Sequence, residues 1–398
     1  MRRRQGGVPR RGALGGARRR PRRADGGDRR TRARIGVADR ERLRRDGDLR
    51  RPAALDDTSG DLVSAQQLDG RVSAWGRPVI DFHCHFPVPE EFTPDADAAY
   101  AAANGAEKLA KLRDDWRWYQ EQWWTAYGFP FPEDIEPPED VQRTRWEAEI
   151  ESAQLDAVVF VTGGGNAQLA RIVAPSPRMV GFAHHDPFAP GAADELRRAV
   201  VDDGMRGYKL IAPALRGPID HPDLRPVWAA AEELGIPVLV HFGPLDGGGG
   251  TAWHENISPL RLHDVAKAFT YVPFVIPHFG CGYPRELLHL AWACRNVHVD
   301  TSGNNEWIRW MPYELTVADL FRRFYETVGP ERILFGSDSA SFPRGLARKY
   351  YDTQFAAVAE VGIPDSDLSL IFHDNAARLL KLPTVGATSS AGEADGAR

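Results

Sequence analysis

Short, continuously apolar runs recur along the chain from residue 78 onward, and amphipathic stretches of helical periodicity separate most of them. Uninterrupted apolar runs are typical of parallel strands that are buried on both faces, whereas half-exposed strands alternate. The runs predict strands at residues 78–83, 157–161, 179–183, 205–211, 236–240, 274–276, 297–299 and 333–335. Eight strand–helix units over about 260 residues predict an α/β fold of the (β/α)₈ TIM-barrel type.

The intervening segments predict one helix each. These helices are expected at residues 141–154, 166–173, 192–201, 225–234, 259–269, 283–293 and 315–327. The first strand is instead followed by a long insertion, residues 90–139, with a predicted helix at 98–113 and an aromatic cluster of Trp116, Trp118, Tyr119, Trp123, Trp124 and Tyr127. An insertion at the C-terminal end of a strand lies over the barrel mouth. The cluster either walls a substrate pocket, forms a subunit interface or makes a local mini-core.

The N-terminal part of the chain differs from the rest in charge. Residues 1–52 hold 20 Arg, no Lys and six Asp or Glu, which gives this segment a charge of +14. The net charge of the whole chain is −5, so the remaining residues carry a charge of −19. Because this segment has few large apolar residues, we expect a disordered leader over residues 1–70, a barrel domain over 76–385 and a disordered tail over 386–398. The leader is a polyanion-binding arm, a targeting peptide or the product of an upstream start in a GC-rich gene. We favour the third, because Arg without Lys resembles codon composition. The acidic body gives no reason to expect a nucleic-acid partner.

The cellular location is predicted from the lack of membrane and export segments and from the number of cysteines. No apolar run is long enough to cross a membrane, and no apolar h-region follows the arginines, as a twin-Arg export signal requires. Cys84, Cys281 and Cys294 form a sparse, odd set without a C-x-x-C spacing, which is typical of a reducing compartment. We therefore expect a cytoplasmic protein without a membrane partner.

Two histidines end the first predicted strand. His83 and His85 are two residues apart, and side chains at that spacing share one face of a strand, so they can present two imidazoles to one point. Imidazole is the commonest neutral ligand for zinc, iron and manganese. Cys84 lies between them and is expected to pack on the opposite face.

Polar residues occur at the same end of other strands. His241 ends the fifth run, His278 follows the sixth and Asp338 follows the eighth, while Lys209 lies in the fourth. Active sites of this fold lie at the C-terminal ends of the strands. Buried polar groups need partners, and a shared cation would supply one for all of them.

Taken together, these motifs resemble the amidohydrolase superfamily, and more closely its amidohydrolase-2 branch, which includes aminocarboxymuconate semialdehyde decarboxylase and γ-resorcylate decarboxylase. The resemblance covers residues 76–383 and rests on DFHCH at 81, GYKL at 207, VLVHFG at 238, VIPHFG at 275, NVHVDTSG at 296, ILFGSDS at 333 and the terminal HDNAARLLKL. It implies that His83, His85, His241 and Asp338 bind one divalent metal, in the first place zinc, with manganese or iron as alternatives. It also implies that His278 acts as acid or base beside that metal.

The chemistry of this ligand set agrees with those roles. Three imidazoles and one carboxylate leave a divalent ion with net positive charge and room for a water, whose pKa it lowers toward about 7. Asp338 would accept that water's proton, and His278 would hold an oxyanion or protonate a leaving group. In binuclear members of the superfamily a carboxylated lysine on strand four bridges two metals, and Lys209 lies at about that place. We favour one metal; Lys209 then contacts a substrate carboxylate or is structural.

Substrate contacts are expected from the loops that follow the strands. Trp307, Arg309 and Arg344, with Lys209, are the substrate-binding candidates, because aromatic rings with an arginine suit a planar carboxylated molecule. The alternative for each arginine is a surface ion pair. The glycines at 247–250, followed by Trp253 and His254, form a flexible segment that would serve as a lid.

We expect an enzyme that hydrolyses an ester, lactone or amide bond of a small carboxylated molecule, aromatic or not, through a metal-activated water. The alternative is a metal-dependent non-oxidative decarboxylase of an aromatic or unsaturated acid, which would use the same ligands. We favour hydrolysis because the superfamily's chemistry is predominantly hydrolytic. A third hypothesis, a polyanion-binding arm on a degenerate barrel, conflicts with the intact ligand set. Members of the branch are often dimers, so a homodimer is expected.

Overall fold

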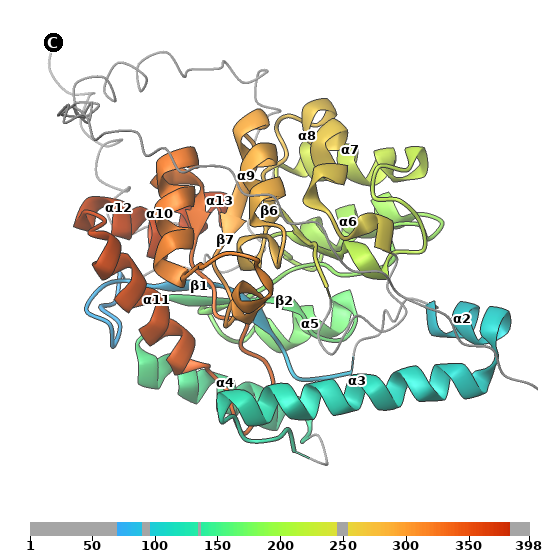
Figure 1. Cartoon of the computed structure of the whole chain (residues 1–398), viewed down its shortest axis with the longest axis horizontal. Coiled ribbons are helices and arrows are strands. Elements are labelled where there is room, and N and C mark those ends of the chain that lie inside the picture. Colours follow the sequence, from blue (N-terminus) through green and yellow to red (C-terminus); the bar gives the residue numbers. More distant parts are fainter. Residues whose placement is uncertain (1–69, 90–95, 134–136, 245–253, 383–398) are drawn as a thin grey trace, which may run out of the picture. The chain divides into compact units, whose positions relative to one another are not determined.

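The structure, a computed structural model, describes residues 70–89, 96–133, 137–244 and 254–382 (Figure 1). The predicted leader, except Gly70, lies outside the described residues, and so do the predicted tail, the glycines at 247–250 and Trp253. None of the described helices has the length and apolar character needed to cross a bilayer. The domain boundaries and the cytoplasmic location stay predictions.

All eight predicted strands are present, and they differ from the prediction only at their ends. They are β1 (Ile80–His85), β2 (Ala157–Thr162), β3 (Met179–Gly181), β4 (Tyr208–Ile211), β5 (Val238–His241), β6 (Phe274–Ile276), β7 (Val297–Asp300) and β8 (Ile333–Leu334). Neighbouring strands pair in parallel, in the orders β1-β2-β3 and β4-β5-β6-β7-β8. Nearly every strand residue is buried, which explains why the runs lack polar alternation.

Backbone hydrogen bonds join these two sheets at both edges. The Phe82 amide donates to the Phe335 carbonyl at 3.0 Å, which links β1 to the residue after β8. The Lys209 amide donates to the Ala183 carbonyl at 2.8 Å, which links β4 to the segment after β3. The ring of strands is therefore closed, and the predicted (β/α)₈ barrel is confirmed.

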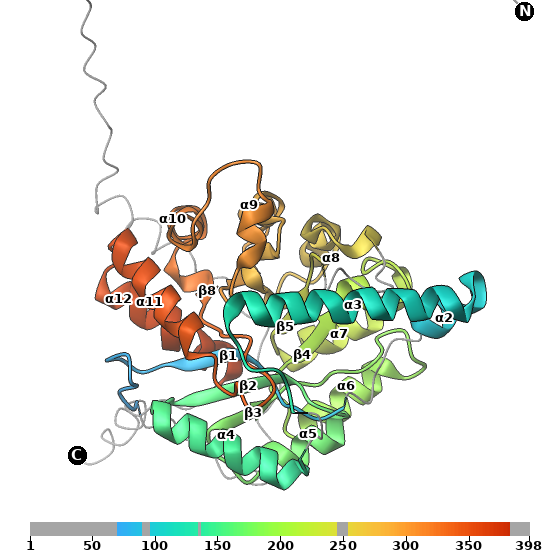
Figure 2. The same cartoon turned by 60° about the horizontal axis from the view of Figure 1, so that its bottom comes forward.

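The helices follow the predicted order, with one correction in the insertion. They are α2 (Ala96–Asn104), α3 (Ala106–Tyr127), α4 (Glu139–Ala153), α5 (Asn166–Val173), α6 (Ala192–Val201), α7 (Arg225–Leu234), α8 (His263–Ala268), α9 (Pro284–Ala293), α10 (Val317–Val328), α11 (Arg348–Val361), α12 (Asp365–Ser369) and α13 (Asn375–Leu380). The single helix predicted at 98–113 was wrong, because Gly105, with a φ of 95°, separates α2 from α3. Helix α3 then continues through the aromatic cluster to Tyr127; it is a long rod along one side of the barrel in Figure 1 and crosses in front of the strands in Figure 2.

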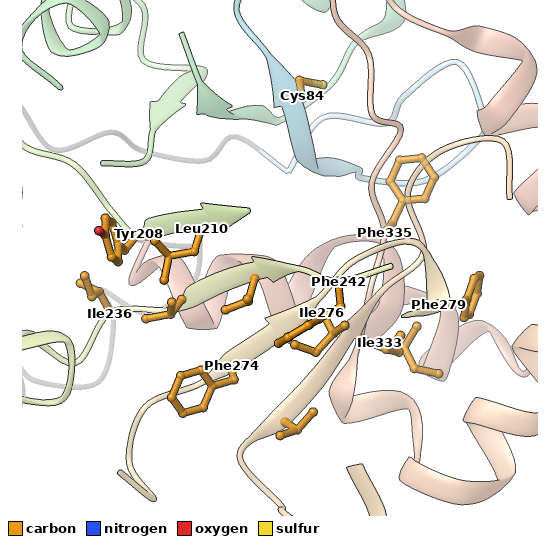
Figure 3. Close-up of a cluster of buried hydrophobic side chains, with 14 of the residues drawn as sticks. Cys84, Tyr208, Leu210, Ile236, Phe242, Phe274, Ile276, Phe279, Ile333 and Phe335 are labelled. Carbon is orange, nitrogen blue, oxygen red and sulfur yellow. The ribbon is translucent and has the colours of Figure 1, made fainter. Parts of the chain in front are cut away.

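The core consists of two clusters that take alternate residues of the strands. The inner cluster fills the barrel and includes Phe82, Phe182 and Leu239, together with Leu380 of α13. The outer cluster lies between strands and helices and includes Tyr208 and Leu210 of β4 and Phe274 and Ile276 of β6, which Figure 3 labels. Because Tyr208 and Leu210 face outward, Lys209 between them points into the barrel.

Asp156, which directly precedes β2, joins segments that are far apart in the sequence. Its fully buried carboxylate accepts hydrogen bonds from the backbone amides of Gly70 at 3.1 Å and Arg71 at 3.3 Å. It also lies 3.0 Å from Nε2 of His373, in the helical segment that precedes α13. This contact ties the first described residues of the chain to its terminal helices.

The Asp156–His373 pair predicts a pH-dependent free energy of unfolding. Burial lowers the pKa of His373, but its hydrogen bonds to Asp156 and Asp374 outweigh burial and hold the pKa above 6.5. Burial raises the pKa of Asp156, but the hydrogen bond from His373 and the backbone donors hold it below 3.8. A raised histidine pKa gives stability that is complete below the unfolded-state pKa and is lost as pH rises through the folded-state pKa. The aspartate's contribution is lost instead as pH falls below 3.8.

We therefore expect His373→Gln to lower the free energy of unfolding more at about pH 5.5 than at about pH 8.5. Urea denaturation at both pH values measures the difference. His289→Gln, a change at an exposed histidine of α9, should show no such dependence. Equal losses at both pH values for His373→Gln would contradict the assignment.

Candidate metal centre

The two histidines of β1 lie side by side at the end of the strand. The ring centroids of His83 and His85 are 5.2 Å apart, and their Nε2 atoms are 3.3 Å apart. Cys84, between them, is buried on the opposite face, with its Sγ 3.6 Å from Ser337 Oγ. The expected alternation along the strand is confirmed, and it directs two imidazoles to one point.

Asp81 departs from this alternation. It would share the face of His83, but the pairing of β1 with β2 changes register between Asp81 and Cys84. The Asp81 carboxylate instead accepts hydrogen bonds from the backbone amide of Ser337 at 2.9 Å and from the Tyr351 hydroxyl at 2.5 Å. Asp81 thus fastens β1 to the loop after β8 and leaves the inner face to the histidines.

Asp338, in the loop after β8, brings a carboxylate to the same point. Its Oδ1 lies 3.1 Å from Nε2 of His85 and 3.7 Å from Nε2 of His83, and ligand atoms of all three residues lie within 4.8 Å of one another. Asp338 has a φ of 59°, a conformation that costs free energy for a non-glycine residue and is concentrated at functional sites. Its backbone amide donates to the His83 carbonyl at 2.7 Å, which holds this conformation in place.

The other ring nitrogens of the two histidines are held by the last residues of β7 and β2. Nδ1 of His83 lies 2.7 Å from Oδ2 of Asp300, the last residue of β7, and Nδ1 of His85 lies 2.7 Å from Oγ1 of Thr162, the last residue of β2. Such contacts orient the rings of metal-binding histidines. We did not predict either residue. Both end an apolar run at the barrel mouth, so the reasoning that selected His241 would have found them.

The pKa values favour metal-binding protonation states. Burial, together with the charge of Lys209, holds the pKa of His83 well below 6.5, so its ring is neutral at pH 7. Burial raises the pKa of Asp338, but the hydrogen bond from His85 and the neighbouring histidines outweigh burial and hold it well below 3.8. Burial raises the pKa of Asp300 to about 8, despite hydrogen bonds from Ser302. A divalent ion on His83 would favour the ionised form of Asp300, so the donor set fits such an ion.

His241 lies beside this group but is not part of it. It ends β5 and is directed inward, and its ring centroid is 5.1 Å from that of His278. Its Nε2 lies 3.4 Å from the carbonyl oxygen of Pro244, the last described residue before 254. The structure therefore brings together three of the four predicted ligands and places the fourth at the side of the site.

Lys209 approaches the candidate metal ligands from the barrel interior. It is buried, and its Nζ lies 3.4 Å from Nε2 of His83. This position is beside a candidate ligand, as a bridging residue would require. The number of metal ions stays a prediction.

His278 lies next to the candidate ligands and is held in one tautomer. Its ring centroid is 5.2 Å from that of His83, and its Nδ1 lies 3.1 Å from the backbone carbonyl of Ser302. A carbonyl oxygen only accepts, and the Ser302 hydroxyl, 3.0 Å from the same Nδ1, donates its hydrogen to Asp300. Nδ1 of His278 therefore carries the hydrogen and Nε2 keeps its lone pair. Burial lowers the pKa of His278, which maintains this neutral form at pH 7.

Gly303 brings the backbone between His278 and Asp338. A Cβ at this position would lie 3.3 Å from His278 Nδ1 and 3.6 Å from Asp338 Oδ2, and the residue has a φ of +81°. We expect Gly303→Ala to strain the backbone and displace His278, and to lower kcat by about 10- to 100-fold, because small misplacements of reacting groups have effects of this size. Steady-state kinetics measures the change. Gly362→Ala, at a φ of +74° with nothing within 4 Å, is the matched control and should retain kcat.

The first two substrate-binding candidates after the strands have different surroundings. Trp307 is 4% exposed, and its indole Nε1 donates to the His278 carbonyl at 3.1 Å. Arg309 is exposed and forms an ion pair with Glu306, which is the alternative foreseen from the sequence. Neither contact tests a role in substrate binding, which stays a prediction for both.

The third candidate, Arg344, lies beside Asp338. Its Nη2 is 3.4 Å from the Asp338 carbonyl oxygen, and its guanidinium lies over the rings of Trp123, Trp124 and Phe129. The two ends of the aromatic cluster therefore differ in their exposure to solvent. The C-terminal end of α3 packs on the loop after β8, while an earlier part of the cluster is exposed, namely Trp116, Trp118 and Tyr119.

Comparisons with known proteins agree with this fold. A family model described as Amidohydrolase matches residues 80–382. The structure is similar to that of 5-carboxyvanillate decarboxylase from Sphingomonas paucimobilis, with 19% identity over 77% of this chain and 99% of that chain and a TM-score of 0.52. It is also similar to a probable 2-pyrone-4,6-dicarboxylic acid hydrolase from Acinetobacter baumannii with bound citric acid (16% identity, 76% and 99% coverage, TM-score 0.50).

A further similar structure contains a metal. It is a mutant 5-carboxyvanillate decarboxylase from Novosphingobium aromaticivorans with bound manganese and a nitrobenzoic acid, at 14% identity, 81% and 100% coverage and a TM-score of 0.50. At these identities the similarities show the fold. A search of curated proteins found no match to this sequence.

Proposed function

The chain belongs to the amidohydrolase family, and from this we propose that it is a metal-dependent hydrolase of an ester, lactone or amide bond in a small carboxylated molecule. The observation that carries the choice of hydrolysis is the tautomer of His278. With Nδ1 donating to Ser302, the lone pair of Nε2 is available to accept a proton beside the candidate ligands.

Each residue of the candidate site would have a separate role in hydrolysis. His83, His85 and Asp338 would hold a divalent ion, for which we propose zinc, and His241 lies beside them as a proposed fourth ligand. When bound, such an ion lowers the pKa of a coordinated water to about 7. His278 Nε2 would take a proton from the attacking water and return it to the leaving group. Asp300 and Thr162 hold the Nδ1 atoms of the two β1 imidazoles and would so orient their Nε2 atoms for the ion.

Decarboxylation would use the same ligands but needs a different state of the acid–base residue. A carbanion left by loss of carbon dioxide must be quenched by a group that already carries a proton. Burial lowers the pKa of His278, so at pH 7 its Nε2 is an acceptor. This difference favours hydrolysis.

A substrate panel tests the proposal. The purified protein would be incubated with aromatic and unsaturated carboxylates that carry an ester, lactone or amide bond, and release of acid would be measured beside release of carbon dioxide. We expect release of acid that stops on chelation and returns with zinc or manganese. Release of carbon dioxide without hydrolysis would replace the hydrolase with a carboxy-lyase.

Metal content tests the number of ions. We expect about one divalent ion per chain in the native protein, loss of that ion in His241→Ala and its retention in Lys209→Ala, as measured by elemental analysis. About two ions, falling with Lys209→Ala, would instead indicate a binuclear site bridged by this lysine. A homodimer, proposed from the family resemblance, is tested by sedimentation.

A further inference from the structure

We propose that Gln354, on the outer helix α11, is a positioning residue that fixes the end of β7 against the end of β8 at the candidate metal centre. It would act through the backbone that carries Asp338 and through Asp300, which holds the ring of His83. This inference rests on the proposed function, because it concerns the placement of the candidate ligands His83 and Asp338.

The side chain of Gln354 is buried, although it belongs to a helix on the outside of the barrel. It is 1% exposed, and its amide lies between two segments at the barrel mouth. Oε1 accepts a hydrogen bond from the Thr301 hydroxyl at 2.5 Å, and Nε2 donates to the carbonyl of Gly336 at 2.9 Å. Because a carbonyl oxygen only accepts, the contact with Gly336 fixes which end of the amide faces which segment.

These two contacts lie where the pairing of β7 with β8 ends. The last pair of the two strands is Asp300 with Leu334, and the Thr301 amide donates to the Leu334 carbonyl at 3.0 Å. The chain then hydrogen-bonds to β1 instead, beginning with the Phe335 carbonyl, which accepts from β1 at 3.0 Å. The amide of Gln354 therefore bridges β7 and β8 just beyond the last described backbone hydrogen bond between them.

Gly336 packs directly against the residues of the first candidate ligand. A Cβ at this position would lie 2.8 Å from Asp300 Oδ1 and 2.9 Å from the Cβ of His83, both closer than real Cβ contacts. The backbone itself makes this approach, so a change of side-chain rotamer at Gly336 cannot absorb a displacement. Asp338 follows two residues later, and we expect a shift of the Gly336 carbonyl to reach its carboxylate.

A buried amide with two hydrogen bonds also stabilises the fold, so positioning must be separated from stability. Asn375 provides the comparison, because it is another amide with 1% exposure, and its Nδ2 donates to the carbonyls of Pro330 at 2.7 Å and Ile333 at 2.9 Å. These acceptors lie at the N-terminal end of β8, whereas the candidate ligands lie at the C-terminal ends of the strands. Loss of either amide removes buried hydrogen bonds, but only loss of Gln354 is expected to disturb the candidate metal centre.

The binding of cobalt(II) to the full chain tests this inference. Affinity would be measured by competition with a chelator, coordination geometry by the visible absorption spectrum, and stability by urea denaturation. The variants are Gln354→Met, which keeps the length of the side chain without the amide, Thr301→Val, which removes the hydroxyl, and Thr301→Ser, which keeps it. Asn375→Leu is the control for a loss of stability alone.

We expect Gln354→Met to weaken cobalt binding by about 10-fold and to change the spectrum, because residues that orient metal ligands have effects of about 10- to 100-fold. Thr301→Val should change both in the same direction by a smaller amount, and Thr301→Ser should match the native chain. Asn375→Leu should lower the urea midpoint about as much as Gln354→Met and keep the native affinity and spectrum.

Native affinity and spectrum in Gln354→Met and Thr301→Val would overturn the inference, and so would an equal change in Asn375→Leu. If Gln354→Met does not fold, the comparison of Thr301→Val with Thr301→Ser decides. Cobalt binding needs no turnover, so a native chain that binds cobalt but hydrolyses no member of the substrate panel would contradict the proposed function alone. A native chain that takes up no cobalt would contradict both.

Discussion

Asp338→Asn is expected to lower kcat by about 1,000-fold and to deplete the bound metal. A carboxamide oxygen is a much weaker ligand than a carboxylate for the cation that His83 and His85 would share with Asp338. Asparagine tolerates a positive φ better than most residues, so the backbone at φ 59° should be kept. The loss would then report on the carboxylate itself.

Elemental analysis and steady-state kinetics on the same preparations measure both effects. Asp365→Asn, at an exposed position of α12 that pairs with Arg77, is the control and should keep its metal and its activity. Thermal unfolding of Asp338→Asn would show that the fold is retained. Full metal content and native kcat in Asp338→Asn would exclude Asp338 as a ligand.

Asp81→Ala is expected to lower the free energy of unfolding by about 3 kcal/mol, because several buried donors would lose their acceptor. Asp81 is fully buried and accepts hydrogen bonds from the amides of His83 and Ser337 and from the hydroxyls of Ser337 and Tyr351. His83 is itself a candidate ligand, and Ser337 directly precedes Asp338. We therefore expect metal affinity to fall by about 10- to 100-fold as well.

Urea denaturation and competition with a metal chelator measure these two effects. Tyr351→Phe removes one of the donors and keeps the carboxylate, so it should cost about 1 kcal/mol and leave metal affinity near that of the native chain. If Asp81→Ala were no more destabilising than Tyr351→Phe, Asp81 would not be the link between β1 and the loop after β8.

The sequence by itself determined the barrel fold and the end of the barrel at which the candidate functional residues lie. Strands covered on both faces must be continuously apolar, so eight such runs specify eight parallel strands. Parallel strands of one barrel end at the same side, so His85, His241 and Asp300 meet there whatever the loops do. The spacing of His83 and His85 fixes their shared face through the two-residue period of a strand.

Tertiary structure decided which side chains work together, because their partners are distant in the sequence. The change of register in β1 turns Asp81 to Tyr351, which alternation within one strand cannot predict. Arg309 and Arg344 were equivalent candidates in the sequence. Only the fold pairs the first with Glu306, a neighbour in the chain, and places the second among rings of the insertion, some 220 residues earlier, beside Asp338. Local pattern specifies faces and ends of elements, whereas packing between elements specifies partners.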